Sequence, residues 1–416
     1  MTRVTRTVIA RSIKLPRKVF RVFVKLEGIY RNMVKQLVMH VVRNNVKSFT
    51  RLKALKYREM RSLYPQLPSH NMHTACQDAS TRAKSFLRLK KLGLVERDYP
   101  EIKRVSIWLD DHLWRPNGLT SIRIATHKGW VIIGVEPHKQ YWKYINRGWR
   151  LAGEGKVKLD KRNRQLIIYL TFVKEVEEFK PRDYPSVDVN ENNVTILVDG
   201  IAYLFETNTE KLVLGYYYRR KRVQERYDKL YSKKSRIKRR VFRKLKERGK
   251  KRDIRWKIAN IIVTAYEKRY AIVLEELGKR PANNMIARIR DKQLRHRIFQ
   301  ASFKGIQRAI EEKAKEYGAS IIYVNPRSAS KLCPIHGTVI TYNNDSRMGK
   351  CFKGGELWHR DVVACLNLLL KALRGGGSPA PSSVGSILDV TRMPFGSKAT
   401  HDPIGIPKSL WRGGSP

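Results

Sequence analysis

Three acidic residues stand where carboxylates can hold divalent cations. Asp188 lies between Val187 and Val189, Glu275 ends the apolar run Ala-Ile-Val-Leu, and Asp361 opens a segment of helical pattern. Converging carboxylates can bind two divalent ions about 3.5 to 4 Å apart, and such a pair promotes phosphodiester hydrolysis. Oxygen ligands favour magnesium or manganese. The candidate catalytic and magnesium-binding residues are therefore Asp188, Glu275 and Asp361.

Each of these acids also has a structural alternative. Asp188 could cap a turn at Asn190, although an acid in an apolar strand is costly unless it binds something. Glu276 is next to Glu275, and because adjacent strand residues face opposite sides, only one of them can reach the metals. Asp361 could simply complement a helix dipole. The occurrence of all three in separate elements favours the site.

The charge of the chain indicates a polyanionic partner. Lys and Arg number 87 against 36 Asp and Glu, a formal net charge of +51. A surface that repels itself so strongly suits phosphate binding, which should weaken steeply with salt. The 416 residues predict about two to four domains.

The sequence favours an intracellular protein. It has no apolar run long enough for a membrane span and no secretory signal, so we expect a cytoplasmic, nucleoid-associated protein with no membrane partner. Its four cysteines are too few for a disulfide framework. Cys76 and Cys365 lie in helical patterns and are expected to be core or surface thiols, whereas Cys333 and Cys351 are candidate metal ligands.

The first half of the chain predicts a barrel with a helical insert. Residues 17–93 have helical periodicity, with a break at 64–68. Short alternating strands follow at 105–109, 121–126, 130–135 and 165–173. Together with the first fifteen residues they predict a small β-barrel or sandwich.

The second half predicts an α/β sheet. Strands at 186–189, 193–198 and 201–205, the last two joined by Asp199-Gly200, open the domain as in an RNase H-like sheet. Residues 219–252 hold nineteen Lys or Arg and three acids, which favours a helix along a phosphate backbone over a solvated or disordered run. We then expect a helix at 254–269, a strand at 271–275, a linker to Phe299, a helix, a strand at 320–324 and a last helix at 361–373.

Taken together, these motifs resemble the TnpB (OrfB) family of transposon-encoded RNA-guided nucleases, related to type V CRISPR effectors. They are DVNENNVT, IVLEEL, the pair CPIHG and CFKGG, and HRDVVACLNLL. The resemblance implies a guide RNA, a target DNA with a short motif read by the protein, and magnesium-dependent cutting. It also favours Glu275 over Glu276, because the family's glutamate is the first of the acidic pair.

The resemblance implies a domain division and a zinc ribbon. A wedge β-barrel would cover 1–16 and 97–180, and a helical recognition insert 17–96. A RuvC-like domain would cover 181–327 and 356–375, including the basic helix 219–252, around a zinc-ribbon-like lobe at 328–355, before a disordered tail at 376–416.

The predicted zinc centre is incomplete. A structural zinc most often takes four N or S ligands. Cys333, His336 and Cys351 supply three, but Gly354 stands where the family has its fourth cysteine. His359 could complete the set, or the ribbon could be held by packing alone.

The sequence thus predicts a multidomain RNA-guided DNA endonuclease that works by two-metal-ion hydrolysis. The alternatives are a guided DNA-binding protein that no longer cuts, a general RNA-binding protein, and a cut-and-paste transposase.

Overall fold

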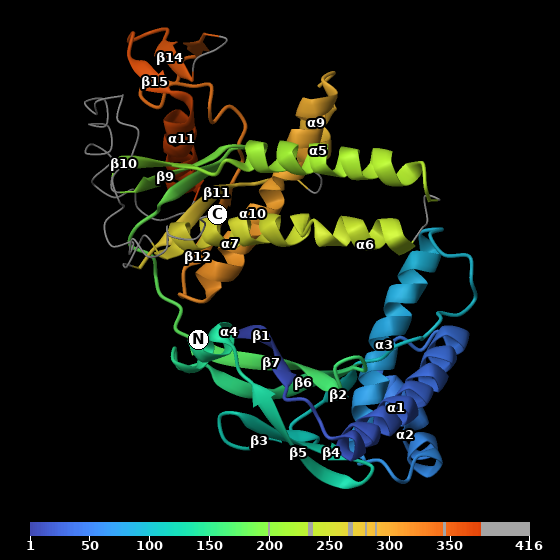
Figure 1. Ribbon diagram of the computed structural model, residues 1–416. Helices are drawn as coiled ribbons and strands as arrows, with labels where there is room; N and C mark the ends of the chain where they lie inside the picture. Colours follow the sequence, from blue (N-terminus) through green and yellow to red (C-terminus); the bar gives the residue numbers. More distant parts are fainter. Residues whose placement is uncertain are drawn as a thin grey trace. The chain divides into compact units, whose positions relative to one another are not determined.

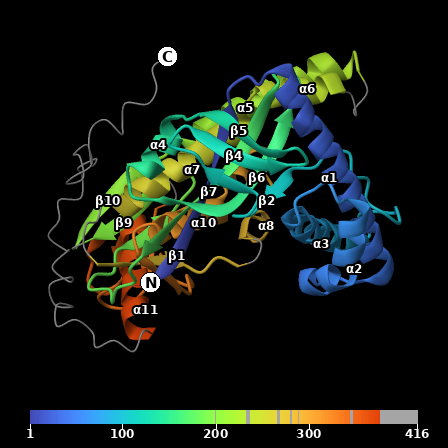
Figure 2. The ribbon, with the colours of Figure 1, turned by 90° about the horizontal axis from the view of Figure 1, so that it is seen from below.

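The computed structural model describes residues 1–198, 200–231, 236–264, 269–278, 281–287, 289–343 and 347–375. The chain forms two compact units, the first of residues 3–175 and the second of residues from 176 onward with Met1 and Thr2. Figure 1 labels most of their helices and strands, and Figure 2 shows them from a second direction. The expectation of more than one domain is confirmed.

A seven-stranded sheet forms the β part of the first unit, in the order β2-β6-β7-β1-β5-β4-β3. Alternating side chains produce it, since every second residue of β7 from Leu166 to Phe172 is buried. The sequence did not predict β3, β6 or α4, and Gly153 and Gly155 interrupt the alternation in β6, where the register with β7 shifts. The elements are β1 (Thr2–Ser12), β2 (Ile107–Leu109), β3 (Trp114–Pro116), β4 (Ser121–Thr126), β5 (Gly129–Glu136), α4 (Lys139–Ile145), β6 (Arg150–Asp160) and β7 (Gln165–Val176).

Three helices lie between β1 and β2: α1 (Arg17–Asn44), α2 (Phe49–Leu63) and α3 (His70–Lys91). The apolar stripe of α1 is buried, as its periodicity predicts, and it includes Leu26, Met33 and Val41. The predicted break falls between α2 and α3. A second break, which the sequence did not reveal, occurs at Asn45, whose φ of 53° ends α1.

The second unit contains a mixed five-stranded sheet in the order β10-β9-β8-β11-β12. β11 is parallel to β8 and β12, whereas β8, β9 and β10 are antiparallel neighbours. These strands were predicted, although Asp199 of the expected hairpin turn lies outside the described residues. They are β8 (Ser186–Val189), β9 (Asn193–Val198), β10 (Ile201–Glu206), β11 (Ala271–Glu275) and β12 (Ser320–Val324).

Helices of the second unit differ from the prediction in two places. The basic segment 219–252 is not one helix but parts of α5 (Thr209–Asp228), α6 (Arg236–Lys244) and α7 (Glu247–Thr264). The apolar residues keep helical spacing across the breaks, so the sequence did not reveal them. One break lies at Lys246, which has a φ of 56°. The expected linker before Phe299 also contains structure, namely α8 (Pro281–Ile286) and most of α9 (Lys292–Ala301).

Helices α7 and α10 (Phe303–Lys315) cover one face of this sheet, and α11 (Arg360–Gly375) covers the other. A hydrophobic core on the α7 and α10 side includes Val187 and Val189 of β8 with Ile272 and Leu274 of β11. Val273, by contrast, packs with α11. Strand alternation therefore turns the neighbouring positions, 188 and 275, towards α11.

A small three-stranded antiparallel sheet precedes α11. It consists of β13 (Ile340–Tyr342), β14 (Met348–Cys351) and β15 (Leu357–His359). The expected disordered tail lies outside the described residues. Among the helices that the structure describes, none is both apolar and long enough to span a bilayer.

Glycine substitutions test the entry into β12. Gly318 has a φ of +71°, and a Cβ there would lie 2.4 Å from the carbonyl oxygen of Glu177. We expect Gly318→Ala to lower the free energy of unfolding by about 1 to 3 kcal/mol. Gly215→Ala, inside α5 with open space around it, should instead raise it by about 0.5 to 1 kcal/mol. Urea unfolding measures both, and equal effects would contradict the fold described for β12.

Candidate functional site

Asp188 and Glu275 lie side by side at one edge of the five-stranded sheet. β8 and β11 are parallel, with Ser186 opposite Val273 and Val187 opposite Leu274. The next step of this register brings Asp188 opposite Glu275. Because parallel strands end at the same edge, both carboxylates emerge there. Glu276 is exposed, whereas Glu275 is half-buried.

Asp361 reaches the same place from α11. Ser186 donates its hydroxyl to the Cys365 carbonyl at 2.8 Å, and the Cys365 thiol lies 3.5 Å from the Thr195 carbonyl. These contacts hold α11 against β8 and β9. Asp361 lies one turn before Cys365 on the same helix face and is only 2% exposed. The structure thus brings the three predicted acids together.

The carboxylates influence one another electrostatically. Burial, followed by the negative charge of Asp361, raises the pKa of Asp188 to about 6. Burial, followed by the charge of Asp188, raises the pKa of Glu275 to about 7. Clustered buried carboxylates hold their protons unless a cation neutralises them. Their donor set fits hard divalent ions.

Arg347 is a member of this cluster that sequence reasoning missed. Its Nη1 lies 2.6 and 2.7 Å from the two carboxylate oxygens of Asp361. The Arg347 side chain is 49% exposed, so its guanidinium also meets solvent beside the acids. Only strand pairing could have revealed it, because Arg347 precedes β14 while Asp361 follows β15.

The structural alternatives for the acids hold in part. Asn190 donates its side-chain amide to Asp188 at 2.8 Å, so Asp188 does take part in the turn. His359 accepts the backbone N–H of Asp361 at 3.3 Å through Nδ1. His359 therefore contacts the start of α11, and it is not among the described side chains that gather as possible metal ligands beside the small sheet.

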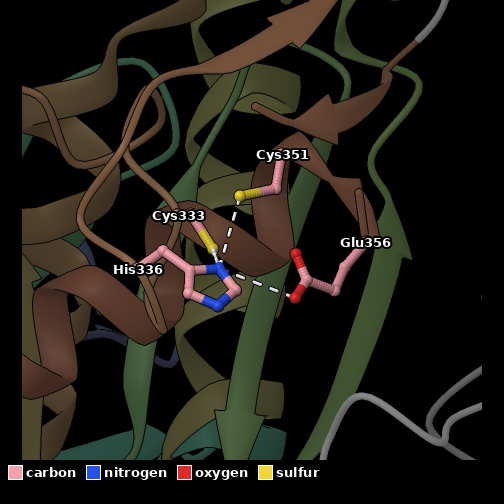
Figure 3. A group of neighbouring side chains, drawn as sticks. All are labelled: Cys333, His336, Cys351 and Glu356. Atoms are coloured by element: carbon pink, nitrogen blue, oxygen red, sulfur yellow. Dashed lines mark hydrogen bonds and ion pairs between the residues drawn. The ribbon is translucent and has the colours of Figure 1, made fainter. Parts of the chain in front are cut away.

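The predicted metal ligands Cys333, His336 and Cys351 do come together beside the small sheet (Figure 3). His336 Nδ1 lies 3.7 Å from Cys333 Sγ and 3.5 Å from Cys351 Sγ. Glu356, which stands in no recognised ligand motif, joins them. These residue types can bind zinc.

The two thiols differ in acidity. Burial raises the pKa of the Cys333 thiol. Burial also acts to raise that of Cys351, but hydrogen bonds from the backbone N–H groups of Gly354 and Lys353 and from the side chains of Thr338 and His336 together outweigh it and lower the pKa to about 7. Metals bind the thiolate form. Cys76 and Cys365, in contrast, are buried core thiols.

A basic groove of about 960 Å³ lies among α5, α6, α7 and α9. Of the described residues that line it, only Glu247 is acidic, and it pairs with Arg220 at 3.4 Å. Aromatic rings share the groove with the cations, a combination suited to nucleic acids. The cations and rings are Arg220, Lys221, Arg243, Lys246, Arg248, Tyr217, Phe242 and His296.

Comparisons with known proteins agree with this architecture. Residues 303–368 match the family model of the Cas12f1-like TNB domain, and residues 26–125 match that of the uncharacterized protein MJ0013 family. A TnpB-like protein of Methanocaldococcus jannaschii, MJ0751, is 29% identical over 228 residues, 51% of this chain and 78% of its own length. The uncharacterized protein MJ0857 of the same organism is 27% identical over 245 residues, 54% of this chain and 89% of its own length.

The fold also has a solved counterpart. The structure of a Cas12f1–sgRNA–target DNA complex matches with a TM-score of 0.59 and 15% sequence identity, covering 85% of this chain and 83% of that chain. This likeness shows a shared multidomain fold. The TnpB-like relative and the match to the Cas12f1-like TNB family model confirm the resemblance to the TnpB family.

Neutralising one acid tests cation binding. At pH 8, Mg²⁺ should raise the melting temperature of the native chain but not that of Glu275→Gln, which loses a ligand. Glu276→Gln, whose side chain is exposed, is the matched control and should respond like the native chain. Equal responses of the two variants would contradict the assignment of Glu275.

The raised pKa values predict a pH window for the same response. Asp188 and Glu275 keep protons in the folded state up to about pH 6 and 7, so protons compete with the metal there. Without metal, the folded chain holds more protons than the unfolded chain between about pH 4 and 7, so these groups reduce its stability as pH rises. Melting curves from pH 5 to 8 should show that stabilisation by the metal increases with pH. A stabilisation that decreases as pH rises would contradict the raised pKa values.

Proposed function

We propose that this chain, a relative of the TnpB-like and Cas12f1-like proteins, is an RNA-guided DNA endonuclease. The observation that carries the proposal is the meeting of three carboxylates from β8, β11 and α11 in a strongly basic chain. A general RNA-binding protein would explain the charge but gives these clustered acids no role. The Cas12f1 of similar fold was solved with sgRNA and target DNA.

In this proposal Asp188, Glu275 and Asp361 hold magnesium or manganese. When bound, the ions activate water and stabilise the leaving oxygen of the phosphodiester. Arg347 holds the Asp361 carboxylate and presents its exposed guanidinium to the same place. The positive charge of this guanidinium attracts the substrate phosphate.

The remaining parts take supporting roles in the proposal. Guide pairing selects the sequence, while the protein binds the nucleic-acid backbone. We assign the wedge barrel to 1–16 and 97–180, the recognition insert to 17–96, and the RuvC-like domain to 181–327 and 356–375. The lobe at 328–355 would be a ribbon in which Cys333, His336 and Cys351 bind structural zinc.

Cleavage by the purified ribonucleoprotein tests the activity. The chain purified with its RNA should cut a plasmid carrying a guide-matched site when magnesium is present. Asp188→Asn should abolish cutting while leaving DNA binding intact, because it removes a metal ligand and adds no bulk. Retained cutting by this variant would contradict the assignment of Asp188. Binding without cutting by the native chain would favour a guided binding protein instead.

Salt dependence tests the basic groove. Removing Arg243 and Lys246 with Gln substitutions should weaken RNA binding and reduce the slope of log K against log salt by about 1 per lost phosphate contact. Lys257→Gln is the control, since Lys257 is exposed on α7, pairs with Asp253 and does not line the groove. Filter binding from low to high salt measures the slopes. Equal slopes for all variants would place the RNA elsewhere.

A further inference from the structure

The small sheet holds a fourth group beside the three predicted zinc ligands. Glu356 Oε1 lies 3.5 Å from His336 Nδ1, and the ligand atoms of Cys333, His336, Cys351 and Glu356 all lie within 4.8 Å of one another. In Figure 3 the two thiols, the imidazole and the carboxylate point towards one common centre. Cys351 ends β14, and Glu356 directly precedes β15.

The spacing of these atoms suits a tetrahedral ion better than hydrogen bonds. Zinc bonds of about 2.3 Å to sulfur and about 2.0 to 2.2 Å to nitrogen or oxygen give tetrahedral edges of about 3.6 Å between N and S and about 3.4 Å between N and O. His336 Nδ1 shows 3.7 and 3.5 Å to the two sulfurs and 3.5 Å to the Glu356 oxygen. One imidazole nitrogen carries at most one proton, so it cannot donate a full hydrogen bond to all three neighbours at once.

The Glu356 carboxylate also has an unsatisfied oxygen. Its Oε2 atom is buried and has no hydrogen-bond partner among the described residues. Burying a charged oxygen without a partner is costly. A cation held between the four side chains would neutralise the charge of this carboxylate and so reduce this cost.

Gly354 explains how Glu356 comes to stand in this place. A Cβ at Gly354 would lie 2.1 Å from Glu356 Oε1 and 2.3 Å from His336 Cε1. Gly354 has no positive φ, so its backbone does not require glycine. The lack of space does require glycine, because the Glu356 carboxylate fills the volume that a side chain at position 354 would need.

We propose that Glu356 is the fourth zinc ligand, replacing a cysteine at position 354. The centre then has two thiolates, one imidazole and one carboxylate. This inference rests on the zinc proposed above for Cys333, His336 and Cys351, and it does not depend on nuclease activity.

Metal affinity and cobalt spectra test the inference on the full chain. The native chain should bind about one zinc per molecule, and its cobalt form should show the strong visible absorption of a tetrahedral ion. Glu356→Gln should weaken zinc binding at least about tenfold, since even residues that only support ligands contribute that much. Lys353→Gln, an exposed change in the same loop, is the control and should bind like the native chain.

A ligand exchange gives a sharper test. Gly354→Cys alone should disturb the centre, because its side chain meets Glu356. Gly354→Cys combined with Glu356→Ala should restore tight zinc binding, and a third thiolate should raise the sulfur-to-cobalt charge-transfer absorption by about half. This double variant also shows that loss in Glu356→Gln is not simple misfolding.

The possible failures can be told apart. A native chain that folds but binds neither zinc nor cobalt would overturn the proposed ribbon zinc itself. Zinc bound equally tightly by the native chain and Glu356→Gln would overturn only the role of Glu356. Neither result concerns Asp188, whose role is measured by plasmid cleavage.

Discussion

The two-sided burial of the five-stranded sheet is the constraint on which the candidate active site depends. One set of alternating residues in β8 and β11 fills the core under α7 and α10, so the other set must face α11. Asp188 and Glu275 belong to the second set. A slip of one residue in either strand would turn a carboxylate into an apolar core and a valine or leucine out of it. The apolar residues therefore fix the direction of the acids, and no polar contact has to do so.

The three carboxylates are close enough for their negative charges to repel one another. Of the three, only Asp361 is paired closely with a basic side chain among the residues that the structure describes. Asp361 has the Arg347 guanidinium, whereas the pKa values of Asp188 and Glu275 are raised by burial and by neighbouring negative charge. A site of this kind reduces stability when it is ionised and gains stability when a cation binds. Arg347 is half-exposed, so its guanidinium pairs with Asp361 and also meets solvent beside the acids.

The sequence predicted those features that depend on residues close together in the chain. Strand alternation and the end of an apolar run identified Asp188 and Glu275, and the exposure of Glu276 agrees with choosing its neighbour. Arg347 and Glu356 escaped prediction for a common reason, since each meets its partners only in the folded small sheet and neither stands at a recognised motif spacing. Arg347 reaches Asp361 through the pairing of β14 and β15, and Glu356 meets His336, which lies in the segment before β13. The single helix expected at 219–252 was wrong because apolar periodicity does not reveal a break when both sides keep similar spacing.

The hairpin of β14 and β15 connects the two sites physically. Cys351 ends β14 and Glu356 begins the approach to β15, so an ion held by both would clamp one end of the hairpin. At the other end Met348 pairs with His359, and the Arg360 backbone N–H donates to the Arg347 carbonyl at 2.8 Å. Arg347 is the residue before Met348 and Asp361 is the residue after Arg360, so these pairs position the Arg347–Asp361 contact. Loss of that ion would therefore weaken the pairing of the two strands that position the Arg347–Asp361 contact. The small sheet thus connects the metal ligands to the first residues of α11.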